Sequence, residues 1–414
     1  MNSAYLGGLV CPRCGREASE ADAFVLCPSC VADGQHVNSM PRYDVRRLGA
    51  DWSPDSTEPG IFRYRELLPI AASVRPVSLG EGGTPLISVP FLADRSRVGE
   101  LYVKDESRNP TWSYKDRLAA VGVTKAREAG ADTVVVSSTG NHGAAAAAYA
   151  AAAGMRCIAL TLESVPLTMK VLMQSFGAHV VALRNGPDRW TLMREAVREH
   201  GWVPLSGFVN PPAGSNPFAV DGYKTMAYEI VETLGRCPDV VITPVAYGDG
   251  ITGLHRGFLD LLALGQITRL PRLVAAEVFG AYENALRTGS PGTGSVVTAG
   301  PSVAFSIATP VSAFQGWQAI TASGGTAVAV PDDAEIIRAQ LSLAAATGLY
   351  LEASAALPIA ALEPLSARGA LSTTDTVVCI GTSTGLKDVG PTAGELGPVP
   401  VIEPSLRALE KTMA

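Results

Sequence analysis

Short apolar runs separated by helix-length segments recur along most of this 414-residue chain. Runs of this length suit buried strands, and strands that alternate with helices form parallel sheets through βαβ units. The clearest runs are Thr133–Val136, Arg156–Leu160, Val180–Leu183, Asp239–Val245, Leu273–Val278 and Thr376–Ile380. The pattern predicts an α/β protein with open, mainly parallel sheets between about residue 60 and residue 390, followed by an irregular tail that ends in a short helix.

The composition excludes several classes of protein. Apolar residues make up 47% of the chain and charged residues 17%, so the chain can bury a core and is not disordered. The net charge of −6 argues against a broad nucleic-acid-binding surface. We see no secretory signal at the N-terminus and no apolar stretch long enough to span a bilayer. We therefore expect a cytoplasmic protein that binds neither nucleic acid nor membranes.

Four of the seven cysteines form two C-x-x-C pairs near the N-terminus: Cys11, Cys14, Cys27 and Cys30. In a cytosolic protein this spacing is typical of metal ligands, and four thiolates close a tetrahedral zinc site with no open position. We predict a zinc ribbon over residues 1–45, stabilised by its metal. Zinc ribbons can bind nucleic acid, but residues 1–50 carry five arginines and five acidic residues, which favours a structural role.

Three predicted strands are followed by loops that could hold a ligand, because ligands of open α/β sheets bind outside the carboxyl ends of strands. The loop Ser137–Gly143 precedes an alanine-rich helix and could present hydroxyls and amides to an oxyanion, or simply cap that helix. The loop Gly381–Gly385 carries three hydroxyls that could bind a ring nitrogen or a phosphate, or cap the next segment.

The third loop, Gly248–Gly253, satisfies G-x-G-x-x-G and follows a predicted strand, with Glu277 near the end of the next strand. This arrangement is compatible with a dinucleotide fingerprint, so a nicotinamide-dependent oxidoreductase is one interpretation. Taken alone, the loop predicts only that backbone amides can surround a phosphate.

Several motifs in a fixed order resemble the threonine synthase-like group of fold type II pyridoxal-phosphate enzymes. They are Arg63–Pro69, Gly80–Leu86, Lys104–Glu106, Asn109–Arg117, Ser137–Gly143, Asn216-Pro217, Gly222–Thr225, the 248–253 loop, Ser323–Gly325, Glu352–Ala356 and Gly385–Asp388. The resemblance covers roughly residues 60–390, and an N-terminal zinc ribbon is a known addition in some members.

The resemblance implies two open, twisted, mainly parallel sheet domains with the cofactor between them. Residues 46–118 and 211–414 would form the large pyridoxal-phosphate-binding domain, and residues 119–210 a smaller α/β domain inserted into it. It also implies a homodimer.

The resemblance further assigns roles to individual residues. Lys115 would form the Schiff base with pyridoxal 5'-phosphate and carry the substrate Cα proton. The residues implied for cofactor binding are Asn141, Gly248, Asp249, Gly250, Ile251, Thr252 and Thr382. Those implied for substrate binding are Thr84, Trp112, Ser138, Thr139, Gly140, Asn141 and His142. Trp112 stands where the family commonly has a small residue, so its indole is expected to reshape the pocket.

The activity implied is that of a carbon–oxygen lyase acting on a γ- or β-activated amino acid through a Lys115 aldimine. The leading reaction converts O-phosphohomoserine to threonine and phosphate. The alternative is β-elimination or β-replacement on serine, threonine or an O-activated amino acid, and the Gly140-Asn141-His142-Gly143 loop resembles serine/threonine dehydratases. Thr382 would leave the cofactor's ring nitrogen unprotonated, which suits these reactions better than transamination.

Overall fold

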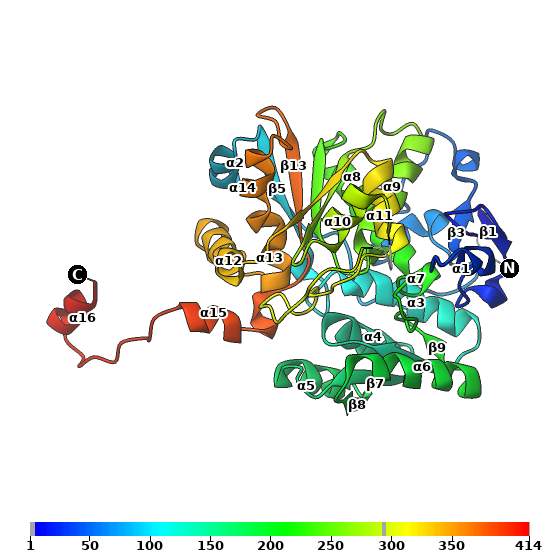
Figure 1. The fold of residues 1–414 in the computed structure, drawn as a ribbon, viewed down its shortest axis with the longest axis horizontal. Helices are drawn as coiled ribbons and strands as arrows, with labels where there is room; N and C mark the ends of the chain where they lie inside the picture. The colour runs from blue at the N-terminus through cyan, green and yellow to red at the C-terminus, as the bar shows by residue number, and fades with distance from the viewer. Residues whose placement is uncertain (1–4, 292–294, 414) are drawn as a thin grey trace.

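The computed structural model describes residues 5–291 and 295–413, and its N-terminal part is a small separate module (Figure 1). In this module the strands β1 (Leu6–Val10), β2 (Glu17–Ala18) and β3 (Met40–Tyr43) form an antiparallel sheet in the order β2-β1-β3. The short helix α1 (Pro28–Ala32) lies between β2 and β3 in the chain. The predicted cysteine pairs all belong to this module.

The N-terminal module is fastened to the rest of the chain by hydrogen bonds to distant residues. Asn38 Nδ2 donates to the carbonyl oxygen of Ser215 at 3.2 Å, and the Tyr43 hydroxyl donates to Asp221 Oδ2 at 2.7 Å. The module therefore docks on a surface formed by residues more than 170 positions later.

The larger of the remaining sheets has six strands in the order β12-β11-β10-β13-β5-β4. Its strands are β4 (Leu86–Ser88), β5 (Glu100–Asp105), β10 (Val240–Pro244), β11 (Arg272–Glu277), β12 (Thr326–Ala329) and β13 (Thr376–Gly381). All neighbouring pairs are parallel except β4, which lies antiparallel to β5 at one edge. A parallel sheet needs cover on both faces, which explains the continuous apolar runs in its strands.

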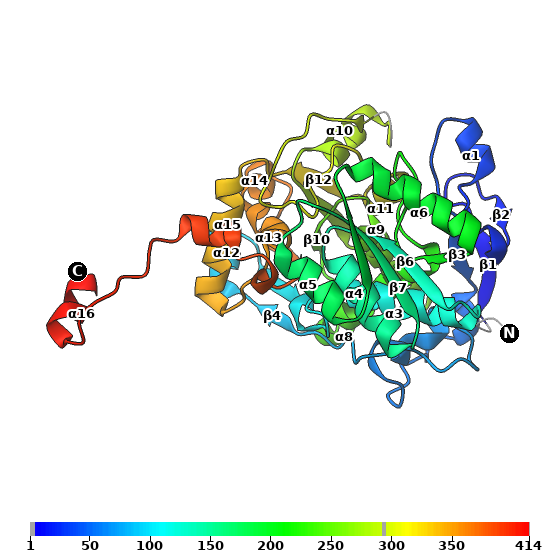
Figure 2. The ribbon, with the colours of Figure 1, turned by 90° about the horizontal axis from the view of Figure 1, so that it is seen from below.

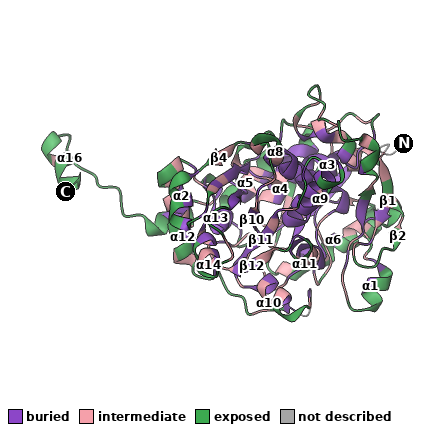
Figure 3. Cartoon of the chain, turned by 90° about the horizontal axis from the view of Figure 1, so that it is seen from above, coloured by how far each residue is buried: buried purple, intermediate pink, exposed green. Residues whose placement is uncertain are grey.

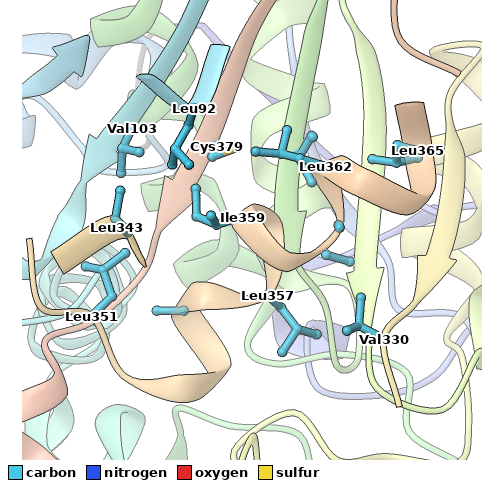
Figure 4. Packing of buried hydrophobic residues seen from close by; sticks show 14 of the residues in the cluster. Leu92, Val103, Val330, Leu343, Leu351, Leu357, Ile359, Leu362, Leu365 and Cys379 are labelled. Atoms are coloured by element: carbon cyan, nitrogen blue, oxygen red, sulfur yellow. The ribbon is translucent and has the colours of Figure 1, made fainter. Parts of the chain in front are cut away.

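Alternate residues of the central strands belong to different cores. Val240 and Val377 pack into one core, whereas their neighbours Val241 and Val378 pack into another. Helices α2 (Pro90–Ser96), α12 (Asp333–Thr347), α13 (Ala353–Ala360) and α14 (Leu362–Ala367) cover the first face. Figure 4 shows Leu357, Ile359 and Leu362 packed in the first core. Helices α8 (Lys224–Leu234), α9 (Asp249–Ala263), α10 (Ala281–Thr288) and α11 (Phe314–Ala322) cover the second.

The smaller sheet contains four parallel strands in the order β8-β7-β6-β9. They are β6 (Thr133–Ser137), β7 (Arg156–Leu162), β8 (His179–Leu183) and β9 (Val203–Pro204). Helices α3 (Lys115–Glu128), α4 (Asn141–Ala152) and α5 (Leu167–Ser175) pack on one face, and α6 (Gly186–His200) packs on the other. Figure 1 shows this layer below the large sheet.

The six strands predicted from the apolar runs are all present as parallel strands, which confirms the α/β class. The small-sheet strands lie between residues 133 and 204, and the large-sheet strands lie before and after them. The proposed inserted domain, residues 119–210, contains all four strands of the small sheet. Helix α3 joins the two parts, because Leu118 packs with the large-sheet core and Ala119 with the small-sheet core.

The chain ends in a tail that leaves the body of the molecule. After α15 (Gly390–Glu395) an extended segment leads to α16 (Leu406–Met413), which stands apart and is exposed (Figures 2 and 3). The tail has the predicted form, with the further short helix α15 at its start. None of the helices in the described residues could cross a lipid bilayer, since each is too short or too polar.

We predict that Gly253→Ala destabilises the fold, because a Cβ at Gly253 would lie 2.3 Å from the Cβ of Tyr223. Overpacking of this kind costs about 1–3 kcal/mol. Denaturant unfolding should show this loss, whereas Gly394→Ala, where a Cβ meets nothing within 4 Å, should unfold as the wild type does. Equal stability of the two variants would contradict the packing described for α9.

Candidate active site

A cavity of about 340 Å³ lies where strands of both sheets end, between β6 on one side and β10 and β13 on the other. Its walls bring together most of the residues proposed for the site from the sequence. These are Lys115, Ser138, Thr139, Gly140, Asn141, His142, Gly248, Asp249, Gly250, Ile251 and Thr382. The carboxyl ends of the strands thus converge on one ligand-sized space, as expected for open α/β sheets.

Lys115 is the first residue of α3, and its ammonium group lies over two aromatic rings. Its Nζ is 4.7 Å from the ring centre of Tyr114 and 5.5 Å from that of Tyr223, and these two rings stack on each other. Across residues 5–291 and 295–413, Nζ makes no ion pair and no hydrogen bond. The amine is therefore oriented by cation–π contacts and stays available to a ligand.

A buried charge cluster fixes the start of α3, two residues beyond Lys115. Arg117 pairs with Glu106 and with Glu229, each at 2.7 Å, and Lys104 also pairs with Glu229 at 2.7 Å. Burial acts to raise the pKa of Glu229, but the charges of Arg117 and Lys104 outweigh it and hold that pKa below its usual range. The cluster therefore stays charged, and it connects α3, β5 and α8.

The side chain of Asn141 is held by three partners at the N-terminus of α4. Its Nδ2 donates to both carboxylate oxygens of Glu352 at 3.0 Å, and its Oδ1 accepts from Lys387 Nζ at 2.7 Å. Ser383 Oγ also donates to that Oδ1, at 3.3 Å. Burial lowers the pKa of Lys387 to about 8, against the opposing charge of Glu352. The amide of Asn141 is thus fixed in orientation, with Oδ1 as acceptor.

His142 is buried at the cavity wall and is neutral. Burial, together with the charge of Lys115, lowers the pKa of His142 well below its usual range. Within the part of the chain that the structure describes, its Nε2 has no hydrogen-bond partner. The neighbouring Ser138 uses its hydroxyl oxygen as a cap that accepts from the amides of Gly140 and Gly143, at 3.1 and 3.0 Å. The loop therefore both caps α4 and lines the cavity.

The loop at Gly248 ends in the N-terminus of α9 and requires glycine at that position. Gly248 has φ +85°, and a Cβ there would lie 2.7 Å from the Cα of Gly316. The carboxylate of Asp249 accepts from Ser215 Oγ at 2.6 Å and from Gln315 Nε2 at 2.9 Å. Because this carboxylate is already bound, the loop offers an anion its backbone amides at a helix N-terminus.

Three residues expected at the site are not among those that line the cavity. Thr84 lies in the buried charge cluster, where its hydroxyl donates to Glu106 at 2.6 Å. Trp112 adopts φ +60°, and its indole is exposed to solvent. The Trp112 carbonyl oxygen accepts from Ser383 Oγ, so its backbone ties two loops together. Thr252 is buried within the first turn of α9.

The cavity wall also contains residues that the sequence interpretation did not select. Glu352 lines the cavity, whereas Lys387 is not a lining residue but donates to the lining residue Asn141. Both stand in motifs that carried the resemblance, so a sequence signal for them existed. Tyr114 directly precedes Lys115 and could have been found in the same way. Arg189, on α6, lines the cavity without belonging to any motif, and only the fold brings it there.

The four cysteines of the N-terminal module gather at one point. The sulfurs of Cys11 and Cys30 are 3.5 Å apart, those of Cys14 and Cys27 are 3.6 Å apart, and all four lie within 4.8 Å of one another. These distances exceed a disulfide bond of about 2 Å and suit four ligands around one tetrahedral ion. The cluster is thus compatible with a structural metal site.

A family model described as "pyridoxal-phosphate dependent enzyme" matches residues 77–383, the range that contains the cavity. The chain belongs to this family. Membership of a pyridoxal-phosphate family agrees with the Schiff-base chemistry that the sequence implied.

Curated relatives match most of the chain. A threonine synthase of Methanosarcina acetivorans is 34% identical over 92% of this chain and 92% of its own length. The threonine synthases of Methanocaldococcus jannaschii and Synechocystis are 36% and 37% identical over 80% and 79% of this chain, and over 81% and 83% of their own lengths. Relatives that share most of their length with this chain confirm its place in the threonine synthase-like group of pyridoxal-phosphate lyases.

Solved structures with the same fold are more distant in sequence. Maize serine racemase matches with a TM-score of 0.63 at 19% identity, over 80% of this chain and 91% of its own. A structure of O-ureido-L-serine synthase matches with a TM-score of 0.62 at 23% identity, over 80% and 96%. These likenesses confirm the fold of type II pyridoxal-phosphate enzymes.

The dinucleotide interpretation of the Gly248–Gly253 loop is wrong. Glu277, the acidic residue that would have to bind a ribose, instead accepts from the amides of Tyr282 and Glu283 at 2.8 and 2.7 Å. Its carboxylate therefore caps the start of α10. Burial raises the pKa of Glu277 to about 7, although these two amides favour its charged form.

This raised pKa predicts a pH dependence of stability. Between about pH 4.5 and 7 the folded chain binds more protons at Glu277 than the unfolded chain does, so stability falls as pH rises, by about 1 kcal/mol per unit. Glu277→Gln should flatten the decline, as followed by urea unfolding at pH 5, 6 and 7. The exposed control Glu195→Gln should keep it. Parallel pH curves for wild type and Glu277→Gln would contradict the assignment.

Proposed function

We propose that this chain is a threonine synthase that converts O-phospho-L-homoserine and water into L-threonine and phosphate. In this reaction the bond between Cγ and the phosphate oxygen breaks, and phosphate leaves with the electron pair. Cβ loses a proton, which ends on the released phosphate; water then supplies a hydroxyl to Cβ and a proton to Cγ, so no external oxidant or reductant is needed. The observation that carries the proposal is the unpaired Lys115 amine in a cavity of this family, together with threonine synthase relatives along most of the chain.

The cavity fits pyridoxal 5'-phosphate in three respects. Lys115 offers an amine without a carboxylate partner in the described chain. The Gly248–Ile251 loop presents amides at the N-terminus of α9, in a turn that a Cβ at Gly248 would fill. Asn141 and Thr382 add neutral polar groups to the wall. We propose these residues as the cofactor site, with Lys115 as the covalent attachment. The bound cofactor withdraws electrons from the substrate Cα.

The chain's own residues would then position the substrate and move its protons. Lys115 takes the proton from Cα and returns it, acting as general base and acid. The Ser138–His142 loop binds the substrate carboxylate at the N-terminus of α4, where the helix dipole favours an anion. Neutral His142 adds no charge there. The amide of Asn141 is held in one orientation by its hydrogen bond to Glu352.

We predict that Lys115→Ala removes both the visible absorption band of lysine-bound pyridoxal phosphate and the activity. The measurement is the spectrum of reconstituted protein, followed by titration with O-phospho-L-homoserine and assays of phosphate and threonine. Loss of a catalytic proton carrier lowers kcat by about 10²-fold or more. Lys170→Ala, which changes a partly exposed lysine outside the cavity, should keep both signals.

The same titration separates the proposal from its alternative. If wild type shows the band but releases no phosphate, and instead forms a keto acid and ammonia or a β-substituted amino acid from serine or an O-activated analogue, β-elimination or β-replacement is the function. If wild type never shows the band, Lys115 is not the attachment site.

We also propose that the cysteine cluster binds one structural zinc ion. Purified wild-type protein should contain about one zinc per chain, measured by mass spectrometry of the metal. Cys27→Ser should lose the metal and lower the unfolding midpoint. Cys237→Ser, a change outside the N-terminal module, should keep both. Full metal content in Cys27→Ser would contradict the site.

Two further expectations belong to the same proposal. The homodimer rests on the family resemblance and can be checked by light scattering of the purified chain. A cytoplasmic location fits an enzyme of amino-acid biosynthesis and a chain expected to bind neither nucleic acid nor membranes.

A further inference from the structure

Arg189 is a buried cation on the cavity wall that the proposed chemistry has not used. It lies in the first turn of α6, and only 9% of its surface is exposed. Among the described residues that line the cavity, Arg189 and Lys115 are the two arginine or lysine side chains. Because Lys115 is assigned to the cofactor, Arg189 is the cation left for another ligand.

The bonding of Arg189 is incomplete within the chain. Its Nε donates to the carbonyl oxygen of Gly186 at 3.3 Å. In the described residues its two terminal nitrogens donate no hydrogen bond, and no carboxylate pairs with it. Burial lowers the pKa of Arg189, yet a guanidinium stays protonated in proteins. By contrast, the fully buried Arg117 pairs with Glu106, and the partly buried Arg256 pairs with Asp221.

Neither acidic residue of the cavity neutralises Arg189. The carboxylate of Asp249 is bound by Ser215 and Gln315, and that of Glu352 is bound by Asn141. The residue near Arg189 on the opposite wall is Tyr247, and burial raises the pKa of its phenol, so it remains neutral. A buried, unpaired guanidinium is costly unless a ligand supplies the negative charge.

We propose that Arg189 binds an anionic group on the side chain of the amino-acid substrate, with phosphate as its first choice. Arginine presents a planar fork that matches phosphate and carboxylate oxygens. The cofactor's own phosphate is the other possible source of such an anion, but the amides of the Gly248 loop at the N-terminus of α9 would hold that phosphate. This inference rests on the proposed pyridoxal-phosphate function and adds the residue that selects the substrate class.

The test compares phosphorylated and unphosphorylated ligands on the holoenzyme. The dissociation constants of O-phospho-L-homoserine and L-homoserine, and of O-phospho-L-serine and L-serine, are measured from the shift of the visible band. Arg189→Gln should weaken both phosphorylated ligands roughly 10- to 100-fold, the range for a lost charge-assisted hydrogen bond, and change the neutral ligands less than about twofold. Arg189→Lys should retain part of the preference. Arg194→Gln, an exposed arginine on the same helix, should retain all of it.

Three results would overturn the inference. The first is a wild type that binds no phosphorylated ligand more tightly than its neutral counterpart. The second is an Arg189→Gln variant that keeps the wild-type preference. The third is weakened binding of pyridoxal phosphate in Arg189→Gln with the preference unchanged, which would assign Arg189 to the cofactor. Tight binding of O-phospho-L-homoserine without phosphate release would refute only the threonine synthase proposal, because the Arg189 test measures dissociation constants and not turnover.

Discussion

The pairing of Arg117 with Glu106 and Glu229 is the interaction on which the geometry of this molecule depends. These charges come from α3, from the segment after β5 and from α8, and they meet where water is excluded. Removing one partner from such a buried set commonly costs about 3–5 kcal/mol, because the remaining charge is left unpaired. The cluster therefore holds the first turn of α3 in one place, and Lys115 with it.

Helix α3 packs against both halves of the structure, so its fixed first turn sets the position of each half relative to Lys115. Its residue Leu118 packs with the large-sheet core, while Ala119 packs with the small-sheet core. The cavity has one wall from each sheet, so any movement of the small sheet must be accommodated along this helix. Such a movement would shift Arg189 and the Ser138–His142 loop relative to Lys115, and so change the distance between the two cations of the cavity.

The sequence predicted most of the fold because its apolar runs are long and bounded, as Thr376–Ile380 and the observed β13 illustrate. It predicted those parts of the site that depend on a short local motif, such as the glycine loop at Gly248 that presents backbone amides. It failed where a local conformation or a distant partner decides the role. Trp112 turns outward at a positive φ, Glu277 caps a helix, and Arg189 reaches the cavity only through the packing of α6 on the small sheet.

The docking of the N-terminal module has a consequence for the order in which the chain assembles on the ribosome. All four cysteines are present once residue 30 has been made, whereas the carbonyl of Ser215 that receives Asn38 appears about 180 residues later. At 5–20 residues per second this delay is roughly 10–40 s. The module is therefore attached only through the chain while residues 31–215 are made, and it can dock only after the segment that leads to the Gly248 loop has been synthesised.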